Sequence, residues 1–186
     1  MHFKKRSIII LSILLLLIVA VFGFVYSRSV WRAERAIGNL LRQIEREGIN
    51  EISLTVYYIL PATGRQYQSI RSLVDGGYHY RIFVEGFQME EHIDALRRIG
   101  DINLTSTERR TRVSASMHYV FRDKHNRRIL DVTMFGSGGR GGNHLVYNTS
   151  VFVNGVEVEW DDIFIEIIYP FLSEDRARWW EEGIKR

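Results

Sequence analysis

The chain has 186 residues, with 25 Lys and Arg, 22 Asp and Glu, and no cysteine. The missing cysteine excludes a disulfide framework and any metal site built from thiolates. Three of the basic residues precede the first apolar run, and every acidic residue follows it. The part of the chain after this run therefore has no net charge, which argues against a general nucleic-acid-binding protein.

Residues 7–26 contain no charged side chain and are predominantly apolar. About twenty such residues in one α-helix span the hydrocarbon core of a bilayer. A cleaved signal peptide is the alternative, but the run is long and its exit at Phe22 to Tyr26 is bulky, with Ser27 and Ser29 the only weak cleavage signature. We therefore expect residues 1–6 to be a short basic cytoplasmic N-terminus and residues 7–26 to be an uncleaved signal anchor.

The orientation of this anchor is not fixed by basic residues. Lys4, Lys5 and Arg6 precede the run, while Arg28, Arg32 and Arg35 follow it, so the positive-inside rule does not decide. The run is N-terminal, as export signals are, and no second apolar stretch of spanning length follows. We predict a single-pass protein of the cell membrane whose C-terminal domain is extracytoplasmic.

An amphipathic helix is expected in the juxtamembrane segment 27–48. Its apolar residues recur every three or four positions, and Gly48 ends it; they are Val30, Ala33, Ile37, Leu40 and Ile44. The same positions fit about two heptads, fewer than a coiled coil needs. Packing on the domain's own sheet is favoured, and a homodimer through this helix is the alternative.

Residues 49–186 are expected to form the extracytoplasmic domain. Alternation predicts strands over 52–58 and 78–84, separated by a stretch 65–74 that is loop or a short strand and by a turn at 75–77. A helix is predicted over 88–99, because Glu90 and Glu91 lie in its first turn and Arg97 and Arg98 in its last.

The second half reads as two hairpins and further helices. Alternating residues in 113–121 and 129–135 predict a hairpin across 123–128, and Asn154-Gly155 predicts a type I′ turn between 151–153 and 156–158. Asp161 or Asp162 caps a helix over 163–168 that Pro170 interrupts, and a last helix begins at Ser173. The expected fold class is α+β, a mainly antiparallel sheet with packed helices, preceded by the single N-terminal transmembrane helix.

The glycine-rich segment after the first hairpin matches G-x-G-x-x-G. That motif binds a dinucleotide only when a helix follows directly, and residues 143–147 read as a strand instead. We interpret the segment as a partner-contact loop consisting of Gly136, Ser137, Gly138, Gly139, Arg140, Gly141 and Gly142.

No metal, cofactor or catalytic residue is assigned. The acidic cluster at 90–94, which includes His92, is explained by helix-end charge, and the cluster at 157–162 by strand exposure and capping. The histidines show no H-x-H or H-E-x-x-H spacing, and no G-x-S-x-G elbow is present.

Arginines are concentrated around the predicted first hairpin. Guanidinium groups bind phosphate or carboxylate through two parallel hydrogen bonds, so clustered arginines indicate anion contact. The predicted anion-binding residues are Arg109, Arg110, Arg112, Arg122, Arg127 and Arg128.

Together these features predict a membrane-anchored extracytoplasmic interaction domain that is not catalytic. Its partner is expected to be a protein or an anionic envelope component, either a lipid or a wall polymer, and not nucleic acid. The alternative is a cell-envelope hydrolase whose dispersed active site cannot be seen in the sequence.

Overall fold

A computed structural model describes residues 14–17, 30–59, 69–77, 80–105, 114–138 and 145–172. Its centre is a six-stranded antiparallel sheet with the strand order β2-β1-β3-β4-β5-β6. The strands are β1 (Ile52–Tyr58), β2 (Tyr80–Val84), β3 (Ser114–Asp123), β4 (Arg128–Gly138), β5 (Leu145–Val153) and β6 (Val156–Val158). The α+β class predicted from the sequence is confirmed.

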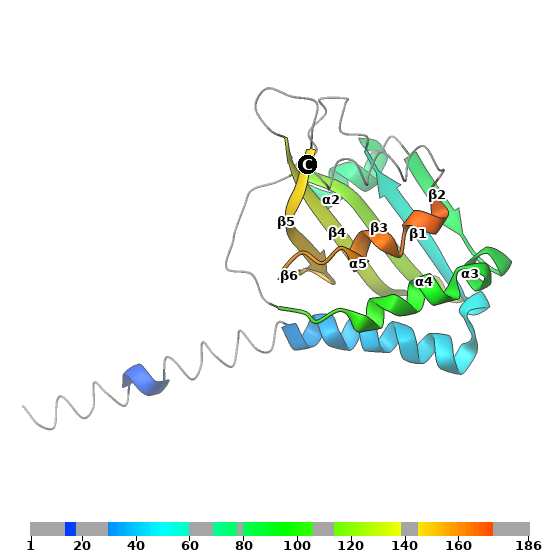
Figure 1. The fold of residues 1–186 in the computed structure, drawn as a ribbon, viewed down its shortest axis with the longest axis horizontal. Helices are drawn as coiled ribbons and strands as arrows, with labels where there is room; N and C mark the ends of the chain where they lie inside the picture. Colours follow the sequence, from blue (N-terminus) through cyan, green and yellow to red (C-terminus); the bar gives the residue numbers. More distant parts are fainter. Residues whose placement is uncertain are drawn as a thin grey trace, which may run out of the picture.

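Helices cover one face of this sheet (Figure 1). They are the helix over residues 30–47, α3 (Phe87–Glu91), α4 (Ile93–Arg97) and α5 (Ile163–Glu166). Leu40, Met89, Leu96 and Phe164 from these helices join one core cluster with the inward side chains of the strands. The opposite face carries a smaller cluster of Ile59, Leu73 and Ala115, and Leu73 reaches it from the turn η3 (Leu73–Gly77) after the short helix α2 (Ile70–Ser72).

The 30–47 helix is amphipathic, as the sequence predicts. Ala33, Ile37, Leu40 and Ile44 are buried in the main cluster, so the apolar stripe packs on the domain's own sheet. Gly48 ends the helix with φ 87°, a left-handed conformation that favours glycine, and its N–H donates to the Ile44 carbonyl at 3.1 Å. Dimerisation through this helix stays a prediction.

Both hairpins are confirmed. β3 and β4 pair across the turn 124–127, and β5 and β6 pair with Val153 opposite Val156 and Val151 opposite Val158. Asn154 and Gly155 have φ of 47° and 77°, as a type I′ turn requires. The backbone N–H of Asp131 on β4 also donates to Asn154 Oδ1 at 2.7 Å, which fixes this turn against the neighbouring strand.

The single helix predicted over 88–99 is wrong in its continuity. The structure has α3, a break at His92 with φ −114° and ψ 20°, then α4 and the 3₁₀ turn η4 (Arg98–Asp101). The His92 ring packs edge-on against Phe171, with ring centroids 5.1 Å apart. This break re-aims the chain so that Met89, Leu96 and Ile99 all reach the core.

The helix after β6 is shorter than predicted. Asp162 directly precedes α5, and the Ile163 N–H donates to Asp161 Oδ1 at 2.9 Å, so the Asp161 side chain satisfies a donor at the start of the helix. α5 ends at Glu166, and the 3₁₀ turn η5 (Tyr169–Phe171) follows, which contains Pro170. The predicted helix from Ser173 lies outside the described residues.

Of the predicted anchor, only residues 14–17 are described, and they form a helical turn. Within the described residues, no helix combines the length and apolar composition that crossing a bilayer requires. The rest of 7–26 lies outside them.

Candidate functional site

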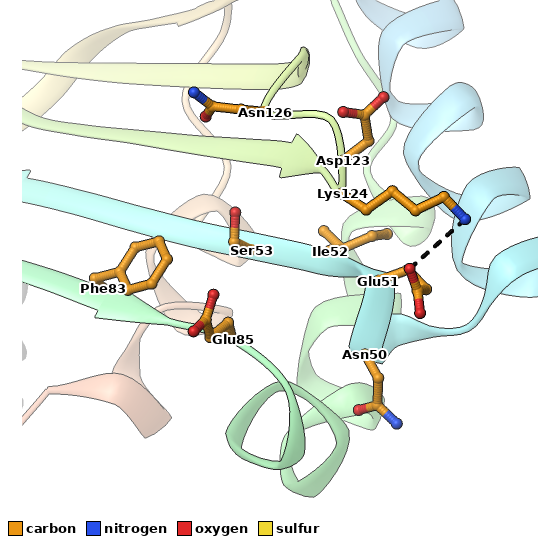
Figure 2. A pocket seen from close by; sticks show the side chains of 9 residues that line it. All are labelled: Asn50, Glu51, Ile52, Ser53, Phe83, Glu85, Asp123, Lys124 and Asn126. Carbon is orange, nitrogen blue, oxygen red and sulfur yellow. Dashed lines mark ion pairs between the residues drawn. The ribbon is translucent and has the colours of Figure 1, made fainter.

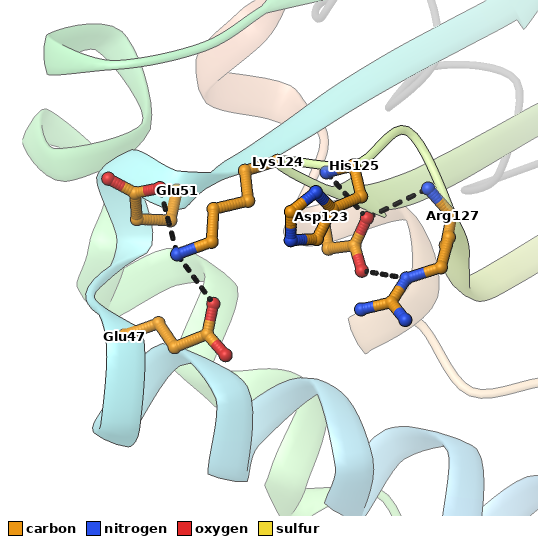
Figure 3. Close-up of polar contacts among 6 residues, drawn as sticks. All are labelled: Glu47, Glu51, Asp123, Lys124, His125 and Arg127. Atoms are coloured by element: carbon orange, nitrogen blue, oxygen red, sulfur yellow. Dashed lines mark hydrogen bonds and ion pairs between the residues drawn. The ribbon is translucent and has the colours of Figure 1, made fainter.

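The turn between β3 and β4 is held by one buried carboxylate. Asp123 Oδ1 accepts hydrogen bonds from the N–H groups of His125 (2.9 Å) and Arg127 (2.8 Å), and Oδ2 accepts from Arg127 Nε at 2.7 Å (Figure 3). Partial burial alone would raise the pKa of Asp123, but these hydrogen bonds outweigh it and hold the pKa below its ordinary value. These hydrogen bonds hold the backbone of the turn and so fix where its side chains begin.

Lys124 connects this turn to the end of the 30–47 helix. Its Nζ lies 3.6 Å from a carboxylate oxygen of Glu47, in the last turn of the helix, and 3.6 Å from one of Glu51 (Figure 3). Lys124 thus links the turn to the end of the helix, and a hollow lies between the turn and the helix.

This hollow, which we call the arginine groove, has a volume of about 400 Å³. The helix forms one wall and the β3–β4 turn the other. It is lined by Asn39, Arg42, Gln43, Arg46, Glu47, Asp123, Arg127, Arg128 and Ile129.

The groove carries positive charge that the domain does not neutralise. Within the described residues, Arg42 and Arg46 form no ion pair, and Arg42 donates only to the neutral Asn39 Oδ1 at 2.5 Å. Arg127 pairs with Asp123 and Arg128 Nη1 lies 2.7 Å from Asp131 Oδ2, yet their side chains remain 74% and 62% exposed. The groove can therefore offer several guanidinium donors to an anion.

The predicted arginine set is only partly brought together. Arg127 and Arg128 line the groove, whereas Arg122 pairs in register opposite Arg128 and donates to the Asn126 carbonyl at 3.2 Å. Arg109, Arg110 and Arg112 lie outside the described residues. Arg42 and Arg46 were missed, although their spacing of four on a helix was a signal that both lie on one side of it.

No known protein family, curated protein or solved structure matches this chain. The function proposed below therefore rests on the chemistry of the protein's own surface.

A second hollow lies on the other side of the β3–β4 turn. Figure 2 shows Phe83 and Glu85 from the β2 side and Lys124 from the turn around it, with Ser53 of β1 between them. Its volume is about 320 Å³, and its carboxylates are those of Glu51, Glu85 and Asp123. Asp123 lines both hollows, so the turn separates a basic side from an acidic side.

The partner-contact loop is described only where it enters. Ser137 and Gly138 continue β4 and pair with Val146 and Leu145 of β5. A strand thus follows the glycines, as predicted, and the dinucleotide arrangement of glycines and helix is not formed. Gly139, Arg140, Gly141 and Gly142 lie outside the described residues.

The closest approach to catalytic chemistry is a pair on β3 and β4. His118 Nδ1 lies 2.9 Å from Thr133 Oγ1, a distance suited to a base and a nucleophile. Thr133 is completely buried, so no substrate can reach this hydroxyl. In the described part of the chain, no three His, Asp or Glu side chains are grouped as a metal site would need. The hydrolase alternative stays a sequence prediction.

The buried His118 predicts a stability that depends on pH. Burial lowers the pKa of His118 most, Asp131 opposes this effect, and Arg128 and Arg122 add to it. The unfolded chain therefore takes up the proton first, and the free energy of unfolding should fall as the pH drops below about 6.5, the ordinary pKa. Urea titrations at a series of pH values measure this slope.

The matched pair for this measurement is His118→Asn and His125→Asn. The first should flatten the slope, because the buried titrating group is gone. The second removes an exposed ring on the β3–β4 turn and controls for the loss of an imidazole as such. Equal slopes in the parent chain and His118→Asn would show that His118 is not the group responsible.

Proposed function

We propose that this protein is a single-pass, membrane-anchored extracytoplasmic interaction domain that binds an anionic component of the envelope, without catalysis. The arginine groove is the observation that carries this proposal. Two of its arginines come from a helix, and the other two come from the β3–β4 turn and the start of β4, about eighty residues later, so the charge is assembled by the fold.

The chemistry of the groove fits an oxyanion such as a phosphate. Each guanidinium presents a planar set of N–H donors that matches two oxygens of one phosphate or carboxylate. Arg42 and Arg46 on one wall and Arg127 and Arg128 on the other can bind an anion from two sides. Asn39 and Gln43 add neutral polar groups between them.

The membrane anchor is proposed from the uncharged run 7–26 of the sequence, of which the structure describes four residues. Leu14, Leu15, Leu16 and Leu17 are between 55% and 69% exposed. Four consecutive exposed leucines are unfavourable in water and favourable in lipid. They lie in the middle of the uncharged run 7–26, which lipid would cover.

The groove is tested by replacing the two arginines that no acidic partner holds. Arg42→Gln/Arg46→Gln should weaken binding of inorganic polyphosphate to the full chain in neutral detergent by at least about tenfold, because each change removes charge-assisted hydrogen bonds. Fluorescence anisotropy of labelled polyphosphate measures the affinity. Arg127 is left intact, since its loss would also disturb the buried Asp123.

The control is Arg71→Gln/Arg97→Gln, which removes the same charge from exposed sites outside the groove. Its affinity should stay within about twofold of the parent chain, since exposed charges beyond a Debye length are largely screened. Equal losses in both variants would mean that net charge alone drives binding, and the groove would no longer be the site.

A further inference from the structure

Resting on the function proposed above, we infer that the anion in the groove is the phosphate headgroup of an anionic phospholipid in the membrane that holds the anchor. The 30–47 helix then lies along the headgroup layer with its arginines facing the lipid. The inference names the ligand class and the orientation of the domain.

The first observation is a stripe of polar side chains along the helix. Arg32, Arg35, Asn39, Arg42 and Arg46 follow one another at intervals of three or four residues and are all exposed. That spacing places them on one side of a helix. The acidic residues of the helix, Glu34, Glu45 and Glu47, do not share this spacing, so the two charges are separated around the axis.

The second observation is that the stripe lies on the side of the helix opposite its buried side. Ala33, Leu40 and Ile44 on the other side of the helix are buried in the core, so this side is already covered by protein. The arginine side is the one left for another surface. The C-terminal end of the stripe, at Arg42 and Arg46, lines the arginine groove. Arg127 and Arg128 add two further guanidinium groups there.

The third observation lies at the start of the helix. Trp31 is half exposed, and the Arg35 guanidinium lies over its ring, 5.1 Å from the centroid. An indole with an adjacent cation suits the boundary between headgroups and hydrocarbon. An exposed tryptophan in this place therefore fits a lipid surface.

The short connection between the apolar run and the 30–47 helix decides how that helix is oriented on the membrane. Residues 27–29 separate the apolar run from the helix, so even an extended connection starts the helix within roughly 14 Å of the hydrocarbon. From Arg32 to Arg46 the helix rises about 21 Å. Standing upright, it would hold Arg42 and Arg46 more than a Debye length of roughly 8 Å from the lipid charge. Lying flat, it brings the whole stripe within reach.

Lipid is favoured over a soluble polyanion because the anchor supplies it. A tethered site meets its ligand at a high effective concentration, so even weak contacts are occupied. Each arginine near an anionic surface should strengthen attachment about fivefold. A polymer chain would have to find the groove from solution without this advantage.

The test uses a single cysteine at Asn39, in the middle of the stripe, since the chain has no other cysteine. The full chain carries a fluorophore there and is reconstituted into phosphatidylcholine vesicles, with or without phosphatidylglycerol. A nitroxide quencher on the lipid headgroups reports proximity. Arg71→Cys, on α2 at the opposite end of the domain in Figure 1, is the control position.

Quenching at Asn39 should be strong with phosphatidylglycerol and weak without it, while the label at Arg71 stays unquenched in both. Adding Arg32→Gln, Arg35→Gln, Arg42→Gln and Arg46→Gln should abolish the difference between the two vesicles. Circular dichroism of this variant should match the parent, because within the described residues none of the four arginines forms an ion pair.

Equal quenching at Asn39 in both vesicles would overturn the inference, since the arginines would then play no part. Polyphosphate binding that depends on Arg42 and Arg46, with no headgroup proximity, would assign the groove to a soluble polyanion and leave the proposed function standing. Loss of the polyphosphate effect itself would end both.

Discussion

Replacing Leu40 with Ala is expected to lower the free energy of unfolding by about 2–5 kcal/mol. Leu40 is completely buried where the 30–47 helix packs on the sheet, so truncation leaves a cavity between the two layers. Urea denaturation in detergent, followed by tryptophan fluorescence, measures the change.

The matched control for Leu40→Ala is Glu45→Ala on the exposed side of the same helix. It keeps helix propensity and removes no core contact, so the change should stay within about 0.5 kcal/mol. If Leu40→Ala were as mild as Glu45→Ala, the helix would not be packed on the domain as described. Its apolar stripe would then be free for another surface, such as a second copy of the chain.

Deleting residues 1–29 is expected to change the chain from a membrane protein to one found in the supernatant. Under the proposed anchor, the apolar run 7–26 would hold the chain in lipid regardless of salt, whereas attachment through the arginine stripe alone would be sensitive to salt. Centrifugation after carbonate extraction of membranes separates the two outcomes. The full chain should stay in the pellet, and the deleted chain should not.

A point variant tests the same anchor without shortening the chain. Leu16→Lys/Leu17→Lys places two charges at the middle of the run, where each costs about 2.5–3.5 kcal/mol of insertion free energy. Leu16→Ile/Leu17→Ile keeps the run apolar and should pellet like the parent. Retention of the lysine variant in carbonate-washed membranes would contradict an anchor in this segment.

Local patterns predict most of the secondary structure, because burial has a simple period. Alternation over 52–58 and over 151–158 identified strands whose inward side chains are buried. The Asn154-Gly155 turn was predicted down to its paired residues, since only a few dipeptides favour two positive φ values in succession. The amphipathic helix and its glycine end follow the same logic.

The break at His92 could not be predicted from its neighbours. The charges at the two ends of 88–99 favour one continuous helix, and nothing local opposes it. The partner of His92 is Phe171, about eighty residues later in the chain. A contact of that kind becomes visible only when the fold brings the two segments together.

The residues of the arginine groove, too, could be predicted from the sequence only in part. Sequence reasoning selected Arg127 and Arg128 because arginines are dense around the first hairpin, but it read Arg42 and Arg46 only as the polar side of a helix. The two pairs lie on opposite walls of one groove, beside the point where Lys124 joins the turn to Glu47 and Glu51. Spacing shows which residues share a helix side, and only tertiary packing shows what that side meets.

The two hollows beside the β3–β4 turn differ in the sign of the charge that lines them. Arginines line one side, and Glu51 and Glu85 line the other. A negatively charged surface attracts the arginine-lined side and repels the glutamate-lined side. Both forces rotate the molecule in the same direction. If the domain is tethered to a membrane as proposed above, this charge separation would give it a preferred rotation about the tether before any specific contact forms.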